Sequence, residues 1–416
     1  MAVPNRIIEL STLIAKETAK LNDFFVQNSL PTPSLEADAL WSLPIPEAET
    51  DLEASRLAVI SACSELKALM TGPKELLYSK WTAYSSVKAI LRFKLDRSFP
   101  VGGSSSFAAM SEFSGLNADN VRRIVRHAIV HHRFFQEKAP GVITHSALTT
   151  ILASDDTMRN CLVVELDEFW PAGAKMADAM EKWPNSEENT ETGFCIANNL
   201  HNKSMFDLFA EDHERGARFD MFFSRNKEPL HLLHDNYSWE SKSSVVDVGG
   251  GQGNVAISLA ERFPHLKCIV QDLPATVADG ESRLPPILRD RVSFMAHDFF
   301  TEQPIVADVY FFRSIFHDWA DKYCIKILQN LIPALKRDSR VLIYEQILPD
   351  YETLSTAAAR KATHMDVGMQ QLLNAKERYA DEWPELIHRA DARFRYLGAR
   401  RPEGGTSWII EAAWQG

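Results

Sequence analysis

The stretch from Val245 to Gly253 constrains the fold of this chain more than any other. A β-branched run leads into four glycines, and an apolar helical pattern follows Gly249, Gly250, Gly251 and Gly253. Glycine lets the backbone approach a ligand where a Cβ would clash, and a helix start offers free N–H groups. About twenty residues on, a second β-rich run ends at Asp272, whose carboxylate can accept ribose hydroxyl groups. The pattern predicts one βαβ unit built for a nucleoside-containing cofactor.

The glycines do not satisfy the strict dinucleotide fingerprint G-x-G-x-x-G. Counted from Gly249, the last position is Asn254. Counted from Gly251, it is Ala256, which fits only the looser form that ends in alanine. No P-loop lysine follows. From this stretch alone, a glycine-rich turn in an unrelated α/β domain remains an alternative.

Composition and charge narrow the class of protein. The chain has 416 residues, of which 45% are apolar and 24% are charged, as in ordinary soluble globular proteins. Its net charge of −11 disfavours nucleic acid as a partner. Five scattered cysteines form no C-x-x-C pair and predict reduced thiols in a cytoplasmic setting, with no metal site. Neither a signal peptide nor a membrane-spanning run is expected, so no membrane partner is predicted.

The sequence predicts four segments. Residues 1–74 form a helical extension, with helices expected over 5–28 and from about 48 to a stop at Gly72-Pro73. Residues 75–150 begin with a helix over about 75–95 and continue as a helix-turn-helix with a β-wing. Residues 151–240 are a helical linker that contributes to a substrate pocket. Residues 241–416 alternate strands and helices, which predicts an α/β fold with a mostly parallel sheet.

The helix-turn-helix pattern by itself would suggest DNA binding. The local basic cluster is small, however, and the whole chain is acidic, which argues against that function; the cluster consists of Arg122, Arg123, Arg126 and Arg133. The long N-terminal helices could pair between subunits or form an ordinary helical core. Both interpretations remain open from the sequence.

Three acids are expected at successive strand ends, where ligands sit in open α/β sheets. They are Asp247, Asp272 and Asp298. Asp272 would hold a ribose, and Asp298 could accept a hydrogen bond from an exocyclic amine. Phe299, which follows directly, could pack against a purine face. Each acid alone could equally be a solvated turn residue.

A further strand, over 307–312, delivers His317 just beyond its carboxyl end. A histidine with a pKa near neutrality can take a proton from a phenol or enol. Its neighbour Asp318 cannot be assumed to orient the ring, because adjacent side chains often point apart. The candidate partners are Glu345, which ends a strand, and Glu377. A carboxylate on one ring nitrogen would fix the tautomer and support the imidazolium.

These motifs closely resemble the SAM-dependent O-methyltransferases of the plant caffeate/flavonoid type and their fungal relatives. The matching stretches are Val246-Asp-Val-Gly-Gly-Gly-Gln-Gly, Asp272-Leu-Pro, His297-Asp-Phe-Phe, His317-Asp-Trp, Glu345-Gln-Ile-Leu-Pro and Lys376-Glu-Arg. The resemblance implies a Rossmann-like class I SAM methyltransferase domain with S-adenosylmethionine or S-adenosylhomocysteine bound by Asp247, the four glycines, Asp272, Leu273, Asp298, Phe299 and Arg313. Arg313 stands where plant members have a lysine. His317 would be the general base, flanked by Glu345 and Glu377.

The resemblance extends upstream more weakly. Residues 85–146 look like the family's winged-helix domain, which implies a homodimer, whereas residues 1–74 are less familiar. The acceptor would be a hydroxyl of a small aromatic or polyketide-type secondary metabolite. The substrate wall is expected from helical and aromatic positions, although such positions are individually more often core: Phe194, Asn198, Met205, Phe206, Phe209, Phe316, Trp319, Met365, Met369 and Leu373.

Two other functions are considered. Fungal relatives of this family keep the SAM site without methylating and resemble pericyclases, which dehydrate or cyclise a precursor beside the bound sulfonium; His317 could then be a general acid. The retained His317, Glu345 and Glu377 favour methyl transfer. A non-catalytic regulator built on the winged helix is the third possibility, and the same trio argues against it.

Overall fold

The computed structural model describes residues 5–46, 48–78, 82–225, 228–349 and 356–416. It divides into two compact units. The first holds the chain up to Trp170, His213–Ser224 and the start of α16 (Thr356–Leu373) up to Arg360. The second unit comprises Pro171–Asp212, the described chain from Arg225 up to α16, and the residues from Lys361 to Gly416. The four predicted segments are a finer division and stay a prediction.

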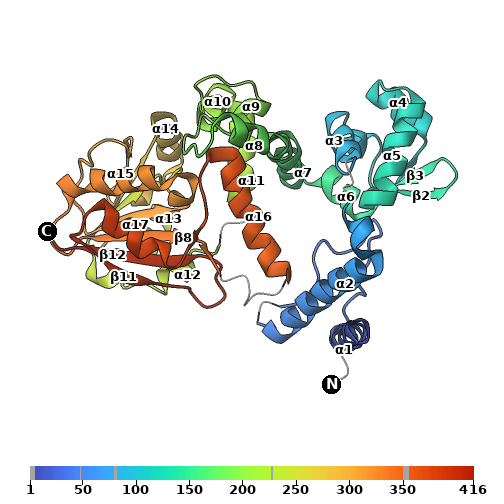
Figure 1. Cartoon of the computed structure of the whole chain (residues 1–416), viewed down its shortest axis with the longest axis horizontal. Helices are drawn as coiled ribbons and strands as arrows, with labels where there is room; N and C mark the ends of the chain where they lie inside the picture. The colour runs from blue at the N-terminus through green and yellow to red at the C-terminus, as the bar shows by residue number, and fades with distance from the viewer. Residues whose placement is uncertain (1–4, 47, 79–81, 226–227, 350–355) are drawn as a thin grey trace. The chain divides into compact units, whose positions relative to one another are not determined.

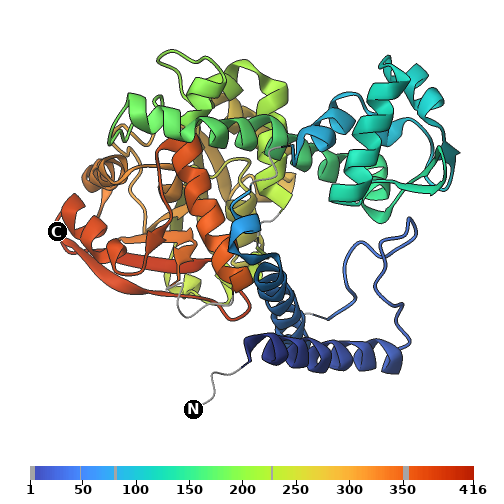
Figure 2. The same cartoon turned by 45° about the vertical axis from the view of Figure 1, so that its right-hand side comes forward.

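The first unit begins with two long helices, α1 (Arg6–Gln27) and α2 (Thr50–Leu76), which cross one another (Figures 1 and 2). Arg6 and Glu65 form an ion pair between them at 2.7 Å. Gly72 adopts φ 76° and kinks α2, which then continues through Pro73 to Leu76. The regular helix that begins at Thr50 is therefore broken at Gly72, as expected, and a short second helical stretch follows across the kink.

The winged-helix pattern is present in the first unit. Three helices accompany a small antiparallel sheet of order β1-β3-β2: α3 (Ser85–Arg92), α4 (Phe107–Ser114), α5 (Ala118–His132), β1 (Ser104–Ser105), β2 (Gln136–Ala139) and β3 (Val142–Thr144). Ser106 caps α4 by accepting from the Ala109 N–H at 3.2 Å. The expected helix over 75–95 is wrong in extent. Within the described residues of that range beyond α2, only α3 is α-helical, and Lys94 with φ 53° leaves the right-handed conformation.

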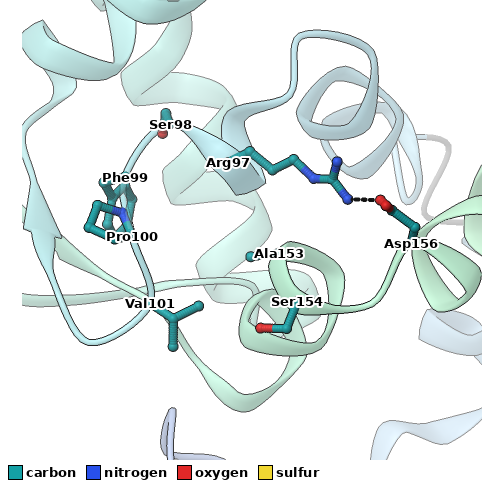
Figure 3. A pocket seen from close by; sticks show the side chains of 8 residues that line it. All are labelled: Arg97, Ser98, Phe99, Pro100, Val101, Ala153, Ser154 and Asp156. Carbon is teal, nitrogen blue, oxygen red and sulfur yellow. Dashed lines mark hydrogen bonds and ion pairs between the residues drawn. The ribbon is translucent and has the colours of Figure 1, made fainter.

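A cavity of about 520 Å³ opens in the first unit beside η1 (Leu95–Arg97). Its wall comprises Arg97, Ser98, Phe99, Pro100, Val101, Ala153, Ser154 and Asp156. Figure 3 shows the Arg97–Asp156 ion pair at one side of it. None of these residues belongs to the predicted site.

Residues 147–240 are mostly helical, as expected. The run comprises α6 (Ala147–Ser154), α7 (Asp156–Val164), the π-helical turn η2 (Glu165–Phe169), α8 (Trp170–Lys182), α9 (Gly193–Ala197), α10 (Met205–Glu211), α11 (His213–Arg225), α12 (His231–His234) and the 3₁₀ turn η3 (Trp239–Ser241). Thr192 caps α9 and Ser204 caps α10 through their hydroxyl groups. No described helix is long and apolar enough to cross a membrane.

The second unit is built on a seven-stranded sheet of order β11-β12-β8-β7-β4-β5-β6. Only β12 runs antiparallel to its neighbours β8 and β11. The strands are β4 (Ser244–Val248), β5 (Lys267–Asp272), β6 (Val292–Ala296), β7 (Val309–Arg313), β8 (Arg340–Glu345), β11 (Phe394–Arg400) and β12 (Trp408–Trp414). The strand order reverses between β4 and β7, which is where an open α/β sheet binds ligands.

Alternate residues of the strands face two separate cores. Tyr310 and Phe312 pack on one side, with α15 (Asp321–Leu331) and α17 (Glu382–Ala390). Val309 and Phe311 pack on the other, with α13 (Asn254–Arg262). Burial on both faces explains why the central strands are continuous apolar runs. The remaining elements are α14 (Pro274–Arg283), η4 (Pro286–Leu288), η5 (Phe316–Asp318), η6 (Ile332–Ala334), β9 (Ile347–Leu348) and β10 (Arg378–Tyr379).

Candidate active site

The glycine loop joins β4 to α13. Gly249, Gly251 and Gly253 have φ angles of 70°, 59° and 79°, which glycine adopts without a steric penalty. A Cβ on Gly249 would lie 2.4 Å from Ile315 Cδ1, whereas a Cβ on Gly251 would meet nothing within 4 Å. The loop thus excludes side chains at one position and borders open space at another. These angles and close approaches are those expected of a backbone cradle, and its role in holding a cofactor stays a prediction.

Asp247 and Asp272 lie beneath and beside this loop. A Cβ on Gly250 would come within 2.6 Å of the Asp247 carboxyl carbon, so Asp247 sits directly under the turn. Asp272 accepts from the Gly251 N–H at 2.9 Å and from the Leu273 N–H at 2.7 Å. Burial raises the pKa of Asp272. Thr276 also hydrogen-bonds to this carboxylate. A carboxylate has about four acceptor sites, so Asp272 can still accept from the expected ribose hydroxyl groups.

The His297-Asp-Phe-Phe stretch follows β6. Phe299 Cε1 lies 3.9 Å from the position of a Cβ on Gly249, so this ring borders the glycine loop. Asp298 is exposed and accepts from the Phe300 N–H at 2.9 Å. Gly249, Asp272 and Phe299 therefore come from three strand ends to one edge of the sheet. Their arrangement fits a nucleoside with its ribose near Asp272 and its base near Phe299.

Arg313 is the last residue of β7, and its side chain contacts other parts of the protein. Its guanidinium donates to the Glu228 carbonyl at 3.3 Å and lies 5.8 Å from the Tyr344 ring centre. Burial lowers the pKa of Arg313. A cofactor contact by Arg313 stays a prediction.

His317 lies on the 3₁₀ turn η5, just beyond β7. Its Nδ1 is 2.9 Å from Glu377 Oε1, and its Nε2 is 3.5 Å from Asp318 Oδ1. The imidazole is 16% exposed, while Glu377 is 3% exposed. The structure thus joins His317 to one of its two expected carboxylate partners. It also places Asp318, which the sequence left aside, within ion-pair distance of the other ring nitrogen.

Glu345 holds the backbone of this turn instead of the imidazole. Its Oε1 accepts from the Ile315 N–H at 2.8 Å and from the Phe316 N–H. The other oxygen, Oε2, is buried and has no hydrogen-bond partner among the described residues. Ser314, with φ 55°, makes the bend between strand and turn. Glu345 therefore fixes where the turn begins.

The charges around His317 favour the imidazolium. Burial opposes a charge on the ring, but the nearby carboxylates of Asp318, Glu377 and Glu345 outweigh it and raise the pKa of His317 well above its usual range. Burial in turn raises the pKa of Glu345. Such a cluster can accept one proton and retain it. Once His317 has lost its proton, the neutral imidazole is therefore a stronger proton acceptor than an ordinary histidine for a hydroxyl group beside it.

Three further charged residues, Asp318, Asp366 and Arg378, lie at the histidine turn although no sequence pattern gives them a part in the site. Asp366, on α16, accepts from the Glu377 N–H at 3.0 Å and so fixes the residue that holds the imidazole. Arg378 contacts the backbone of the histidine turn. No periodicity or spacing reports such contacts. The one available signal was the charge of Arg378 inside the Lys376-Glu-Arg motif.

The predicted substrate positions fall into two groups. Phe206 stacks on Trp319 with ring centres 6.0 Å apart, and Trp319 in turn touches Phe299 at 5.9 Å. These three rings connect α10, the histidine turn and the cofactor edge. Asn198, Phe209 and Met365 are half-buried, while the other positions are buried: Phe194, Met205, Phe316, Met369 and Leu373. The substrate role of all these positions stays a prediction.

Comparison with known proteins identifies the family. Residues 175–393 match the model of the O-methyltransferase domain. O-methyltransferase AMT9 of Alternaria alternata is 36% identical over 99% of this chain and 98% of its own length. The chain belongs to the O-methyltransferase family. The resemblance predicted from the motifs and the enzyme class are thereby confirmed.

Other O-methyltransferases align over nearly the whole chain. The grayanic acid biosynthesis cluster O-methyltransferase of Cladonia grayi is 38% identical over 99% of this chain and 88% of its own length. The chlorophenol O-methyltransferase of Trichoderma longibrachiatum is 32% identical over 99% of this chain and 90% of its own length. The N-terminal region is therefore shared with these relatives.

Solved structures confirm the fold class. OxaC in complex with SAH and oxaline matches with a TM-score of 0.74 at 20% identity, over 98% of this chain and 100% of that one. LepI in complex with SAM matches with a TM-score of 0.68 at 23% identity, over 87% and 94%. S-adenosylmethionine and its demethylated product are thus the cofactors held by structural relatives of this O-methyltransferase. The glycine cradle, Asp272 and Phe299 described above fit that cofactor.

Proposed function

We propose that His317 is the general base of methyl transfer to a hydroxyl group. The carrying observation is the 2.9 Å contact between His317 Nδ1 and Glu377 Oε1 at the end of β7. Accepting from Nδ1–H, Glu377 holds the tautomer in which Nε2 can take a proton. The proton then moves from the acceptor hydroxyl to Nε2, and the carboxylates stabilise the imidazolium.

In this proposal S-adenosylmethionine, when bound, supplies an electrophilic methyl group on a sulfonium. Asp272 accepts from the ribose hydroxyl groups, Phe299 packs against the adenine, and Asp298 accepts from its amine. Asp247 supports the glycine turn from below, since Gly250 has no room for a side chain above it. Orientation of the hydroxyl oxygen toward the methyl group supplies most of the remaining rate enhancement.

The acceptor proposed is a phenolic hydroxyl on a small aromatic or polyketide-type secondary metabolite. The Phe206–Trp319 stack offers a flat apolar wall next to His317, which suits an aromatic ring. One relative is named for chlorophenol, which supports an aromatic acceptor. A pericyclase function has no comparable support, because the likeness to LepI is one of fold.

We further propose that the protein is a homodimer assembled through residues 1–74 and the winged-helix region, residues 75–150. Helices α1 and α2 expose an unusual number of large apolar side chains, which an isolated chain would leave in water: Ile7, Ile8, Leu13, Val26, Ile60, Leu69, Met70 and Leu76. Sedimentation of the full chain should give a dimer. Ile8→Glu combined with Met70→Glu should shift it to monomer, whereas Glu9→Lys on the same helix should not.

The activity is tested by mass spectrometry with S-methyl-labelled S-adenosylmethionine and a panel of phenols and polyketide hydroxyls. Labelled product together with S-adenosylhomocysteine, both lost in His317→Ala, is the expected result. Tight cofactor binding with no S-adenosylhomocysteine on any acceptor would contradict methyl transfer. That outcome would direct the search to cyclisation substrates.

A further inference from the structure

Arg378 is a buried charge that the proposed chemistry does not use. Its side chain is 1% exposed. The guanidinium donates to the Phe316 carbonyl at 2.8 Å and to the Trp319 carbonyl at 2.9 Å. It also pairs with Asp321 at 2.9 Å. These carbonyls belong to the first residue of η5 and to the residue that follows it, so this single side chain contacts both ends of the turn that carries His317.

Glu345 binds the backbone N–H groups at the start of the same turn. That carboxylate collects the N–H groups of Ile315 and Phe316, while Arg378 collects the carbonyls of Phe316 and Trp319. Within the turn the Phe316 carbonyl also accepts from the Trp319 N–H at 3.3 Å, and the Cys324 thiol lies 3.3 Å from both carbonyls. The anion and the cation add to these contacts, so charged side chains bind both ends of a short turn that has few hydrogen bonds of its own.

We propose that Arg378 is a positioning residue for methyl transfer. It sets the place and orientation of His317 by donating hydrogen bonds to the carbonyl groups at both ends of the turn. Sequence proximity supports this role, because Glu377, which holds the imidazole, is its immediate neighbour. Consecutive residues of the chain thus contact the ring of His317 and the backbone of the turn that carries it. The inference rests on the proposed role of His317.

Lysine cannot replace the guanidinium here. The fork of Arg378 reaches two carbonyls and a carboxylate at once through separate nitrogens, whereas an ammonium is a single point donor. Arg378→Lys keeps the positive charge but cannot make all of these hydrogen bonds at once. A displacement of the base by about 1 Å can cost about 100-fold in rate. We therefore expect kcat to fall about 10- to 100-fold while the affinity for S-adenosylmethionine is unchanged.

Loss of a buried guanidinium could also act by general destabilisation, so a matched variant is needed. Arg159 in the first unit makes the same kinds of contact, to the Asp96 carboxylate at 2.8 Å and to the Leu91 carbonyl at 2.5 Å. Arg159→Lys therefore reports the cost of such a loss away from the histidine turn. It should leave kcat on the same acceptor unchanged.

A readout independent of the acceptor measures His317 directly. The full-length protein is treated with diethylpyrocarbonate, and modification of each histidine is followed by peptide mass spectrometry. In Arg378→Lys the imidazole should shift away from the carboxylates that raise its pKa. Because only the neutral ring reacts, the modification rate at His317 should rise by about tenfold for each pKa unit lost. The rates at His265 and His388 should not change, and Arg159→Lys should match the wild type throughout.

An unchanged modification rate at His317 in Arg378→Lys would overturn the inference, and so would an equal rise at all histidines. These outcomes are separable from a failure of the proposed function. Should His317→Ala retain full methyl transfer, the proposed base is wrong, yet the effect of Arg378 on the imidazole is still measured by its modification.

Discussion

The glycine loop and the histidine turn follow neighbouring strands, β4 and β7, but they are held in opposite ways. The loop takes its shape from local backbone angles and from hydrogen bonds to the next strand, where Gly249 and Gly250 donate to the Gln271 carbonyl. The turn at His317 depends on side chains that lie between 29 and 62 residues further along the chain. The glycine loop is shaped mainly by its backbone, whereas the histidine turn is held by distant side chains.

This difference separates two tasks. The loop presents backbone groups and the adjoining Asp272 carboxylate to a cofactor, so damage to it should appear in cofactor affinity. The turn is surrounded by buried carboxylates and a guanidinium, so damage to it should appear in proton transfer. Variants that affect both quantities equally would break the comparison.

The largest expected effect is on catalysis at the turn. His317→Ala should lower the rate of methyl transfer about 100- to 10,000-fold, the usual contribution of a general base. The dissociation constant for S-adenosylmethionine, measured by calorimetry, should stay at the wild-type value. His388→Ala, an exposed histidine on α17, is the control. A matching loss of cofactor affinity would show that the two tasks are not separate.

The reverse result is expected at the loop. Gly249→Ala places a Cβ 2.4 Å from Ile315 Cδ1 and forces a positive φ on alanine. The backbone strain alone is about 1–2 kcal/mol, so cofactor affinity should weaken about tenfold or more, while kcat at saturating cofactor changes far less. Gly404→Ala shares a positive φ but meets nothing within 4 Å, and should bind cofactor normally. Equal affinities of the two variants would contradict the cradle.

The pH profile sharpens the electrostatic side of the comparison. Methyl transfer needs the neutral imidazole, so kcat/KM should rise with pH as His317 loses its proton. Removing a carboxylate that favours the imidazolium lowers the pKa of His317. Glu377→Gln should therefore move the rising limb to lower pH, by about 1 pH unit or more, with a lower plateau. Glu385→Gln on the surface of α17 should leave the limb in place, and a limb unmoved by Glu377→Gln would contradict the cluster.

The smallest expected effect is on stability, at the N-terminal cap of α5 in the first unit. Asn117 caps α5 by accepting from the Asn120 N–H at 2.8 Å. Asn117→Ala should destabilise the winged-helix region by about 1 kcal/mol and lower its Tm by a few degrees in calorimetry. Asn117→Ser should retain most of the stability. Neither should alter the cofactor affinity, and a change there would link the cap to the loop.

The sequence predicted the loop well because its determinants are local. Glycines at fixed positions, a β-branched run before them and an acid at the next strand end are readable from the chain alone. The alternation of strands and helices also predicted the mostly parallel sheet. Local signals also located the break of α2 at Gly72, but they failed in the extent of the helix expected over residues 75–95.

The histidine turn was predicted in its members but not in its connections. The motifs pointed to His317, Glu345 and Glu377, yet both acids were candidates for orienting the imidazole. Only the packing of distant segments decides that Glu377 contacts the ring while Glu345 binds the backbone. Asp366 and Arg378 were missed because their contacts are long-range and follow no period.

The most direct test of the central claim compares wild type and His317→Ala on phenols of increasing acidity, with labelled S-adenosylmethionine at saturation. An acceptor that is already ionised needs no base. The rate lost in His317→Ala should therefore be largest for weakly acidic phenols and should shrink as the phenol becomes ionised at the assay pH. An equal loss across the whole series would contradict proton abstraction by His317.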